Sequence, residues 1–146
     1  MNVRDIHEND ISSCAEIFSR VFSHTPWNEN WNTQSAYERL NHFYQSKGFC
    51  GVLAENNHVI PGFVLGNIEP YYSGSIFYLR EMCTDVTYQS SGIGTQLLKY
   101  LEERLLLLNT HSIYLLTEHN VPAASFYQNR GFKLENNTGS FIKTII

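Results

Sequence analysis

Two glycines separated by a single residue end the segment Gln89–Gly94 (QSSGIG), which follows an apolar run and precedes an amphipathic one. This order predicts a strand, a glycine turn and then a helix. Because glycine has no Cβ, the backbone can turn sharply there and come close to a ligand. The first amides of a helix have no partner inside it, and they point outward with the positive end of the helix dipole. The segment therefore predicts a cradle for a pyrophosphate group.

A second candidate segment, Asn120–Phe132 (NVPAASFYQNRGF), follows later in the chain. Taken together, the two segments resemble the GNAT superfamily of N-acetyltransferases. The first fits that family's acetyl-CoA motif, Q/R-x-x-G-x-G/A, and the second fits its N-x-x-A-x-x-F-Y-x-x-x-G-F element. The order and distance of the two matches make the pair more specific than either match alone. The resemblance implies an acetyltransferase that uses acetyl-CoA.

The resemblance also implies which residues hold acetyl-CoA. The strand before the turn would splay from its neighbour and pair with the pantetheine amides, while Asn120 would bind the pantetheine arm from the other side. Many family members carry basic residues in the turn, whereas this chain has serines, so backbone amides and hydroxyls must bind the phosphates. That departure lowers the expected affinity for the cofactor. The residues expected to bind acetyl-CoA are Met82, Cys83, Thr84, Gln89, Ser90, Ser91, Gly92, Ile93, Gly94, Thr95, Asn120 and Tyr127.

Acetyl transfer to an amine needs an acid for the leaving sulfur and a route for the amine proton. Tyr127 matches the family's proton donor, since a phenol with a reference pKa of about 10 can protonate the thiolate of a thiol with a pKa of about 8.5. The alternative for Tyr127 is a core tyrosine that packs on the sheet. Glu81 is the candidate general base, and Glu69 or a water molecule are the alternatives. Equally, Glu81 and Arg80 can be solvent-facing strand residues, one of them paired.

Cys83 lies beside the expected position of the thioester, which raises the question of an acyl-enzyme. No histidine adjoins it in the same strand, and small buried cysteines are common, so we favour a packing role and direct attack by the amine. The six histidines are scattered without metal-ligand spacing, so no metal site is expected. The three cysteines are odd in number and widely spaced, which indicates reduced thiols in a cytoplasmic protein.

Two loops rich in aromatic and acidic residues are the expected acceptor pocket. Aromatic faces and carboxylates together can bind a cation. The alternative is that the tryptophans only pin their loop to the second helix. The residues expected to bind the acceptor are Trp27, Trp31, Glu69, Tyr71 and Tyr72, with Glu29 nearby.

The composition limits the partners of the protein. Its 146 residues, 42% of them hydrophobic, indicate a single globular domain over residues 1–146. The chain has no cluster of lysine and arginine that would form a nucleic-acid surface, and no apolar run long enough to span a membrane. Neither a nucleic acid nor a membrane is therefore expected as a partner. The net charge of -4 favours a cationic small molecule such as an amino acid, a polyamine or an amino sugar.

Apolar patterns and turn residues predict the elements of the fold. Strands are expected over residues 2–6, 49–54, 59–65, 75–84 and 112–116, the last of them buried, and a final hairpin from residues 132–133 and 141–145. Pro61 indicates a weak spot or an edge in the third strand. Helices are expected over residues 11–22, from Thr33 onward, over 93–105 and from Pro122 to Gly131. The predicted fold is therefore α/β (α+β) and GNAT-like, with a mixed, mostly antiparallel sheet of six to seven strands and about four helices.

These expectations favour an enzyme that moves the acetyl group of acetyl-CoA to a primary amine of a small molecule. Two alternatives keep the same fold: acetylation of a protein N-terminus or lysine, and a non-catalytic CoA-binding regulator. A dinucleotide-binding fold is disfavoured because QSSGIG lacks the G-x-G-x-x-G spacing. Dimers are frequent among similar proteins, so a homodimer is a further expectation.

Overall fold

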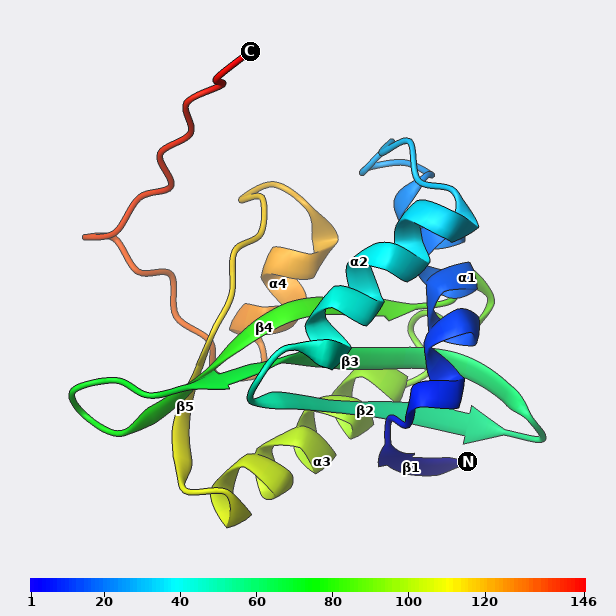
Figure 1. The fold of residues 1–146 in the computed structure, drawn as a ribbon, viewed down its shortest axis with the longest axis horizontal. Coiled ribbons are helices and arrows are strands. Elements are labelled where there is room, and N and C mark those ends of the chain that lie inside the picture. Colours follow the sequence, from blue (N-terminus) through cyan, green and yellow to red (C-terminus); the bar gives the residue numbers. More distant parts are fainter. The chain divides into compact units, whose positions relative to one another are not determined.

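A five-stranded sheet organises residues 1–115 (Figure 1). The computed structural model describes residues 1–146 and divides into two units, Met1–Leu115 and Leu116–Ile146. The strand order is β1-β2-β3-β4-β5, in which β4 and β5 are parallel and the other neighbours are antiparallel. The sheet is therefore mixed and mostly antiparallel, as predicted. The strands are β1 (Asn2–Asp5), β2 (Phe49–Asn56), β3 (Val59–Glu69), β4 (Ser75–Thr84) and β5 (Thr110–Tyr114).

Helices cover both faces of this sheet. Figure 1 shows α1 (Ile11–Phe22) and α2 (Thr33–Gln45) on one face and α3 (Ile93–Leu107) on the other. Each of these helices has apolar residues spaced at every third or fourth position, and this apolar face is the one that is buried against the sheet. On α1 and α2 they comprise Ile11, Cys14, Ile17, Phe18, Val21, Ala36, Leu40 and Phe43, and on α3 they comprise Ile93, Leu97, Leu98, Leu101 and Leu105.

A reciprocal cap fixes the start of α2. The side chain of Asn32 accepts a hydrogen bond from the Ser35 amide at 2.8 Å, and the Ser35 hydroxyl accepts one from the Asn32 amide at 3.1 Å. Such a cap satisfies two amides that the helix itself leaves unpaired. The cap sets the phase of the helix, so that Leu40 and Phe43 face the sheet and Arg39 lies beside them.

The predicted weak spot at Pro61 is a bulge in an inner strand. β3 lies between β2 and β4, so Pro61 is not on an edge of the sheet. The pairing of β3 with β2 shifts between Ala54 and Asn56, next to the proline that has no amide to donate. The carbonyl of Pro61 still accepts a hydrogen bond from the Asp85 amide at 2.8 Å, which ties the end of β4 to β3.

Residues 116–146 contain one helix, α4 (Pro122–Gln128). Pro122 occupies its first turn, where a missing amide costs nothing. Beyond the helix, Gly131 adopts a φ of +91° and its amide bonds to the Gln128 carbonyl at 3.2 Å. The predicted proline start and glycine stop of this helix are both confirmed.

The predicted number of strands is wrong, because the final hairpin does not form. Residues 132–133 and 141–145 are not in strands, so the sheet has five strands rather than six to seven. An alternating pattern makes a strand only when one face of the strand is buried against a neighbour. Phe141 and Ile145 are 96% and 92% exposed, so nothing offsets the entropy of ordering them.

The prediction of a buried last strand also fails. β5 ends the strand order and is paired on one side only, to β4. Most of its side chains are exposed, and only Thr110 is buried. An edge strand can carry apolar residues such as Ile113 without burying them fully, which the sequence pattern alone does not reveal.

Candidate active site

Local hydrogen bonds shape the glycine turn between β4 and α3. A short 3₁₀ helix, η2 (Val86–Tyr88), begins where the Asp85 carboxylate accepts a hydrogen bond from the Thr87 amide at 3.1 Å. The side chain of Gln89 then reaches back and donates to the Thr84 carbonyl at 3.1 Å. The Ser91 hydroxyl donates to the Tyr88 carbonyl. The shape of the turn therefore depends on its own side chains, which explains why Gln89 and Ser91 suit it.

The first turn of α3 has no side-chain cap. Its N-cap residue is Gly92, which adopts a φ of +86°, a left-handed conformation that favours glycine. A Cβ at this position would meet no protein atom within 4 Å, so the space in front of the helix start is open. Ile93, by contrast, is 3% exposed and anchors the helix against Gly62 of β3. An uncapped, fixed helix start with open space in front of it fits a diphosphate.

One edge of β4 is unpaired beyond its middle. β4 pairs with the parallel strand β5 only from Ser75 to Tyr78, where Tyr78 lies opposite Tyr114. From Leu79 to Thr84 the strand pairs with β3 alone. β5 ends at Tyr114, so within residues 1–115 no second strand pairs with this stretch of β4. The backbone of Met82, Cys83 and Thr84 lies along this stretch, where it can pair with amides of an extended ligand.

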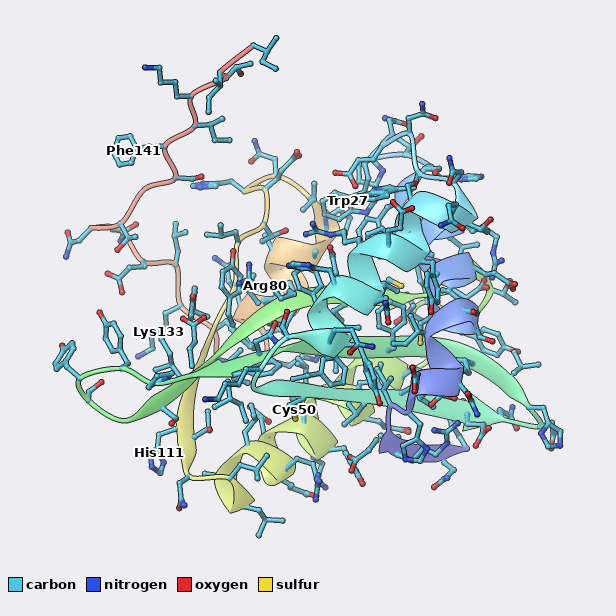
Figure 2. The ribbon with its side chains drawn as sticks, viewed as in Figure 1. Trp27, Cys50, Arg80, His111, Lys133 and Phe141 are labelled. Carbon is cyan, nitrogen blue, oxygen red and sulfur yellow. The ribbon has the colours of Figure 1, made fainter.

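A bulge in β4 turns two consecutive side chains to the same side of the sheet. The register between β3 and β4 shifts at Leu65 and Gly66, opposite Arg80. In a regular strand, Arg80 and Glu81 would point to opposite faces. Here both reach α2: the guanidinium of Arg80 lies 5.3 Å from the ring centre of Phe43, and Glu81 bonds to Arg39. Figure 2 labels Arg80 beside β4 and α2.

Glu81 is a buried, paired carboxylate. Its side chain is 14% exposed, and its Oε2 lies 2.5 Å from the Nε of Arg39. Burial raises the pKa of Glu81 above its usual range, although the charge and hydrogen bond of Arg39 oppose part of the rise. The alternative of a solvent-facing glutamate is therefore wrong, and pairing, also anticipated, is what the structure has. A carboxyl group with a raised pKa suits proton abstraction near neutral pH.

Cys83 is fully enclosed by the core that α1 and α2 form on the sheet. Burial is the main cause that raises the pKa of its thiol well above the usual range. The thiol therefore stays protonated and is a poor nucleophile. This environment agrees with the packing role expected from the sequence.

The tryptophan loop packs on α1, and Trp31 also contacts the second helix through Arg39, whose guanidinium lies 5.9 Å from its ring centre. The ring of Trp31 contacts Phe18 edge-on at 4.9 Å, and Trp27 contacts Phe22 at 5.3 Å. The indole Nε1 of Trp31 donates to the Glu29 carboxylate at 2.8 Å. An open depression of about 350 Å³ lies at this loop, and its lining residues are Glu29, Asn30, Trp31 and Ser35.

The other predicted acceptor loop lies apart from the tryptophans. Tyr71 and Tyr72 stack on each other at 4.7 Å, and they are 57% and 91% exposed. Figure 1 shows the β3–β4 loop that carries them at the far end of the sheet from the α1–α2 connection. The structure therefore does not bring these tyrosines together with Trp27 and Trp31.

Glu69, at the end of β3, accepts a hydrogen bond from Tyr114 of β5, two strands away in the sheet. The hydroxyl of Tyr114 donates to its carboxylate at 2.9 Å, and the ring of Tyr114 stacks on Tyr78 at 4.3 Å. Burial and this hydrogen bond raise the pKa of Tyr114 to about 12, so it remains a donor. Glu69 thus has a partner of its own, separate from the Arg39–Glu81 pair.

The remaining predicted residues lie in the second unit. Asn120 is exposed in the turn before α4, and Tyr127 lies in the last turn of that helix. The ring of Tyr127 packs edge-on between Phe126 at 5.4 Å and Phe132 at 5.3 Å. These contacts hold the ring in a defined orientation within residues 116–146.

Sequence reasoning missed two residues of this region, Arg39 and Phe43. Phe43 was assigned to the core, yet its ring also carries Arg39 at 4.9 Å and Arg80 at 5.3 Å. Arg39 precedes Phe43 by one helical turn, which places both on one stripe of α2. That spacing was the available signal, since an arginine next to a buried stripe often pairs with the element underneath.

The sequence matches the profile of the acetyltransferase (GNAT) family over residues 12–132. The chain therefore belongs to this family of acyltransferases. The match spans most of both units, including the glycine turn and the segment that carries Tyr127. Among curated protein sequences, no relative matches.

Solved structures share the fold at low sequence identity. A transcriptional regulator from Bacillus halodurans C-125 is 20% identical, with a TM-score of 0.80 over 98% of this chain and 99% of that chain. An aminoglycoside acetyltransferase from an uncultured soil metagenomic sample, solved with sisomicin, is 16% identical, with a TM-score of 0.78 over 99% and 96%. An aminoglycoside 6'-N-acetyltransferase from Acinetobacter haemolyticus is 17% identical, with a TM-score of 0.77 over 100% of both chains.

No group of three or more His, Cys, Asp or Glu side chains is arranged to hold a metal ion. No helix has the length and apolar character that a membrane crossing needs.

Proposed function

We propose that the protein transfers the acetyl group of acetyl-CoA to a primary amine of a small molecule by direct attack. The observation that carries the proposal is the unpaired edge of β4, which leads straight into the uncapped start of α3. The pantetheine arm of acetyl-CoA carries amides that can pair with a free strand edge, and the diphosphate at the end of this arm suits a helix start without a cap. Membership of an acetyltransferase family supports the same reading.

Each part of the cofactor has candidate partners. The backbone of Met82–Thr84 would pair with the pantetheine arm, and Asn120 would bind it as well. The turn Gln89–Gly94 and Thr95 would hold the diphosphate with backbone amides, which need no basic side chain. Ser90 is exposed and can add a hydroxyl donor, whereas the hydroxyl of Ser91 already donates to the Tyr88 carbonyl.

Bound acetyl-CoA supplies a thioester: the amine nitrogen forms a bond to its carbonyl carbon, the carbon–sulfur bond breaks, and the sulfur leaves as a thiolate. Glu81 would accept the amine proton, either directly or through a water molecule. Its burial supports that role, because the raised pKa makes its carboxylate a stronger base. Tyr127 would give a proton to the leaving sulfur. A neutral amine thus loses one proton to Glu81 while the sulfur gains one from Tyr127, and solvent carries a proton from Glu81 back to the Tyr127 phenolate. An acceptor that arrives as an ammonium first releases one further proton to solvent.

Direct attack is preferred to an acyl-enzyme because of the state of Cys83. Its thiol is buried and protonated, and no base lies next to it in the strand. A nucleophilic cysteine needs the opposite environment, in which a nearby positive charge stabilises the thiolate. The amine of the acceptor is therefore the only nucleophile that the proposal needs.

The small-molecule acceptor is supported by the two aminoglycoside acetyltransferases that share the fold. The candidate acceptor residues form two groups, Trp27 and Trp31 with the depression at Glu29, and Glu69 with Tyr71 and Tyr72. We give the first group the acceptor role, since Glu81 and Glu29 influence each other electrostatically.

The test is release of free thiol from acetyl-CoA in the presence of a panel of amines, together with calorimetry of CoA binding. Amine-dependent thiol release with micromolar or tighter CoA binding supports the proposal. Binding of CoA without turnover of any small amine would instead favour a protein acceptor or a non-catalytic CoA-binding regulator. Absence of CoA binding would overturn the proposal.

Three further proposals concern the domain organisation, the location and the oligomeric state of the protein. We propose that residues 1–146 act as one domain, because the family match crosses the boundary between the two units. We propose a cytoplasmic location, which the three unpaired cysteines support. A homodimer remains a prediction, which light scattering of the purified protein would check.

A further inference from the structure

The facing side chains of α2 and β4 around Glu81 include one charged group, the guanidinium of Arg80, that has no carboxylate to pair with. We call the residues Arg39, Phe43, Tyr78, Arg80 and Glu81 the α2–β4 wall. Within it, Glu81 is paired with Arg39 at 2.5 Å. Two further acids have neutral donors: Glu29 accepts from the Trp31 indole at 2.8 Å and Glu69 from the Tyr114 hydroxyl at 2.9 Å. No carboxylate of residues 1–115 pairs with Arg80.

Arg80 is held in place by rings rather than by an anion. Its guanidinium lies 3.8 Å from the ring centre of Tyr78 and 5.3 Å from that of Phe43. Contacts of this kind use the flat faces of the guanidinium and leave its N–H groups pointing outward in the plane. The Nε atom is buried and makes no hydrogen bond, so part of the charge is desolvated without compensation.

This arrangement resembles a preformed anion site next to the candidate base. The bulge in β4 is what places Arg80 and Glu81, which are consecutive in sequence, on the same side of the sheet. Bulges near active sites re-aim side chains in this way. An acceptor whose amine approaches Glu81 would therefore have its neighbouring atoms close to Arg80.

We propose that the acceptor carries a carboxylate in addition to the amine, and that Arg80 binds this carboxylate. The inference rests on the proposed N-acetyltransferase function and narrows its substrate class to amino acids in the broad sense, with an amine and an acid in one molecule. A planar carboxylate matches the edge of a guanidinium and can accept two parallel hydrogen bonds. A single unpaired cation also matches the single charge of a carboxylate.

The same charges disfavour a polycationic acceptor. An aminoglycoside or polyamine needs several carboxylates close together, whereas Glu81 is neutralised by Arg39, and Glu29 and Glu69 lie on separate segments, the α1–α2 loop and the end of β3. It would also bring like charge toward Arg80, which costs binding energy. The relatives named for aminoglycosides therefore support a small-molecule acceptor for this chain but do not indicate its charge.

The test compares matched acceptors in matched variants. Free α-, β- and ω-amino acids are assayed by thiol release from acetyl-CoA, each beside its own primary amide, which keeps the amine and the size but removes the charge. Spermidine and kanamycin serve as carboxylate-free amines. The proteins are the wild type, Arg80→Gln, Arg80→Lys and Arg104→Gln. Arg104 is the control because it also has a buried Nε without a partner, but it lies on α3 and pairs with Asp5 at 3.0 Å.

We expect the wild type to prefer at least one free acid over its amide by about 10- to 100-fold in kcat/KM, the range for hydrogen bonds to a charged group. Arg80→Gln should abolish this preference by lowering kcat/KM for the free acid far more than for the amide, whose turnover changes only as far as the lost charge of Arg80 alters Glu81. An unchanged melting temperature shows that the variant is folded. Arg80→Lys should keep part of the preference, and Arg104→Gln all of it.

Two results would overturn the inference while leaving the proposed function intact. One is turnover of amides or of the carboxylate-free amines with no free acid preferred. The other is an equal loss on acids and amides in Arg80→Gln with an unchanged melting temperature. If no amine at all releases thiol, the proposed function itself fails and the inference fails with it.

Discussion

The Nε of Arg39 lies 2.5 Å from the Oε2 of Glu81, and this contact joins α2 to the bulge of β4. The pair sets the behaviour of the candidate base. Burial raises the pKa of Glu81, and Arg39 keeps that rise smaller than burial alone would make it. The guanidinium is itself held over the rings of Phe43 and Trp31, so its position does not depend on Glu81 alone.

Arg39→Gln should raise the pKa of Glu81 further, because the substitution removes the favourable charge and leaves the burial. If Glu81 acts as the base, the acidic limb of the kcat/KM profile moves to higher pH, and activity falls most at the acidic end. The measurement is a pH–rate profile for the best amine of the panel. Arg39→Lys, which keeps the charge, should move the limb less. A limb that moves to lower pH would contradict the expected sign.

Glu81→Gln should lower kcat by about 10²- to 10⁴-fold, the usual contribution of a general base, and should flatten the acidic limb. The same substitution should increase the stability of the folded protein relative to the wild type as the pH rises. The pKa of Glu81 is higher in the folded than in the unfolded protein, so the wild type loses stability as the pH rises from the unfolded pKa through the folded one.

The glutamine variant lacks this loss, so its unfolding free energy in urea, relative to the wild type, should improve as the pH rises above the ordinary pKa of a glutamate. Glu69→Gln is the matched control, because its carboxylate has a separate partner in Tyr114. An acidic limb that is unaltered in Glu81→Gln and lost in Glu69→Gln would transfer the role of base to Glu69. A limb unaltered in both would leave water as the proton acceptor.

The sequence was sufficient for every element whose signal is local. The strand, glycine turn and helix around Gly92 form where predicted, because a positive φ at glycine and a buried Ile93 are properties of neighbouring residues. The proline start and glycine stop of α4 are local in the same sense. The apolar stripe of α3 was equally readable, since one face of a helix repeats within a few residues.

The features that the sequence did not reveal are pairings between distant segments. The bulge at Arg80 depends on how β3 registers with β4, and strict alternation would have separated Arg80 from Glu81. The Arg39–Glu81 pair joins a helix and a strand far apart in the chain. The predicted hairpin at Phe141 fails for the same reason. An alternating pattern does not show whether another segment is present to bury one face of the strand, and Phe141 is left exposed.

Gly92→Glu should abolish binding of CoA, because the side chain brings a negative charge into the open space before the helix start. Gly92→Ala separates this effect from backbone strain. A left-handed conformation costs any residue with a Cβ about 1–2 kcal/mol, and that cost applies to both variants. Alanine should therefore share the loss of thermal stability but retain measurable binding by calorimetry. Equal CoA affinity in the glutamate variant and the wild type would rule out the cradle.

Tyr127→Phe should lower kcat by about 10²-fold or more, and far more than it weakens CoA binding, because it removes a proton donor and keeps the ring. The ring contacts with Phe126 and Phe132 need no hydroxyl and are kept in the variant, and its melting temperature reports any other contact that the hydroxyl makes. Tyr44→Phe is the control: this tyrosine packs on Phe49 at 4.9 Å, away from the residues assigned to chemistry. A leaving group with a lower pKa needs less protonation, so an activated acetyl thioester such as that of a thiophenol should recover part of the lost rate. If Tyr127→Phe matches Tyr44→Phe in kcat with acetyl-CoA, the hydroxyl of Tyr127 serves packing, and water protonates the thiolate.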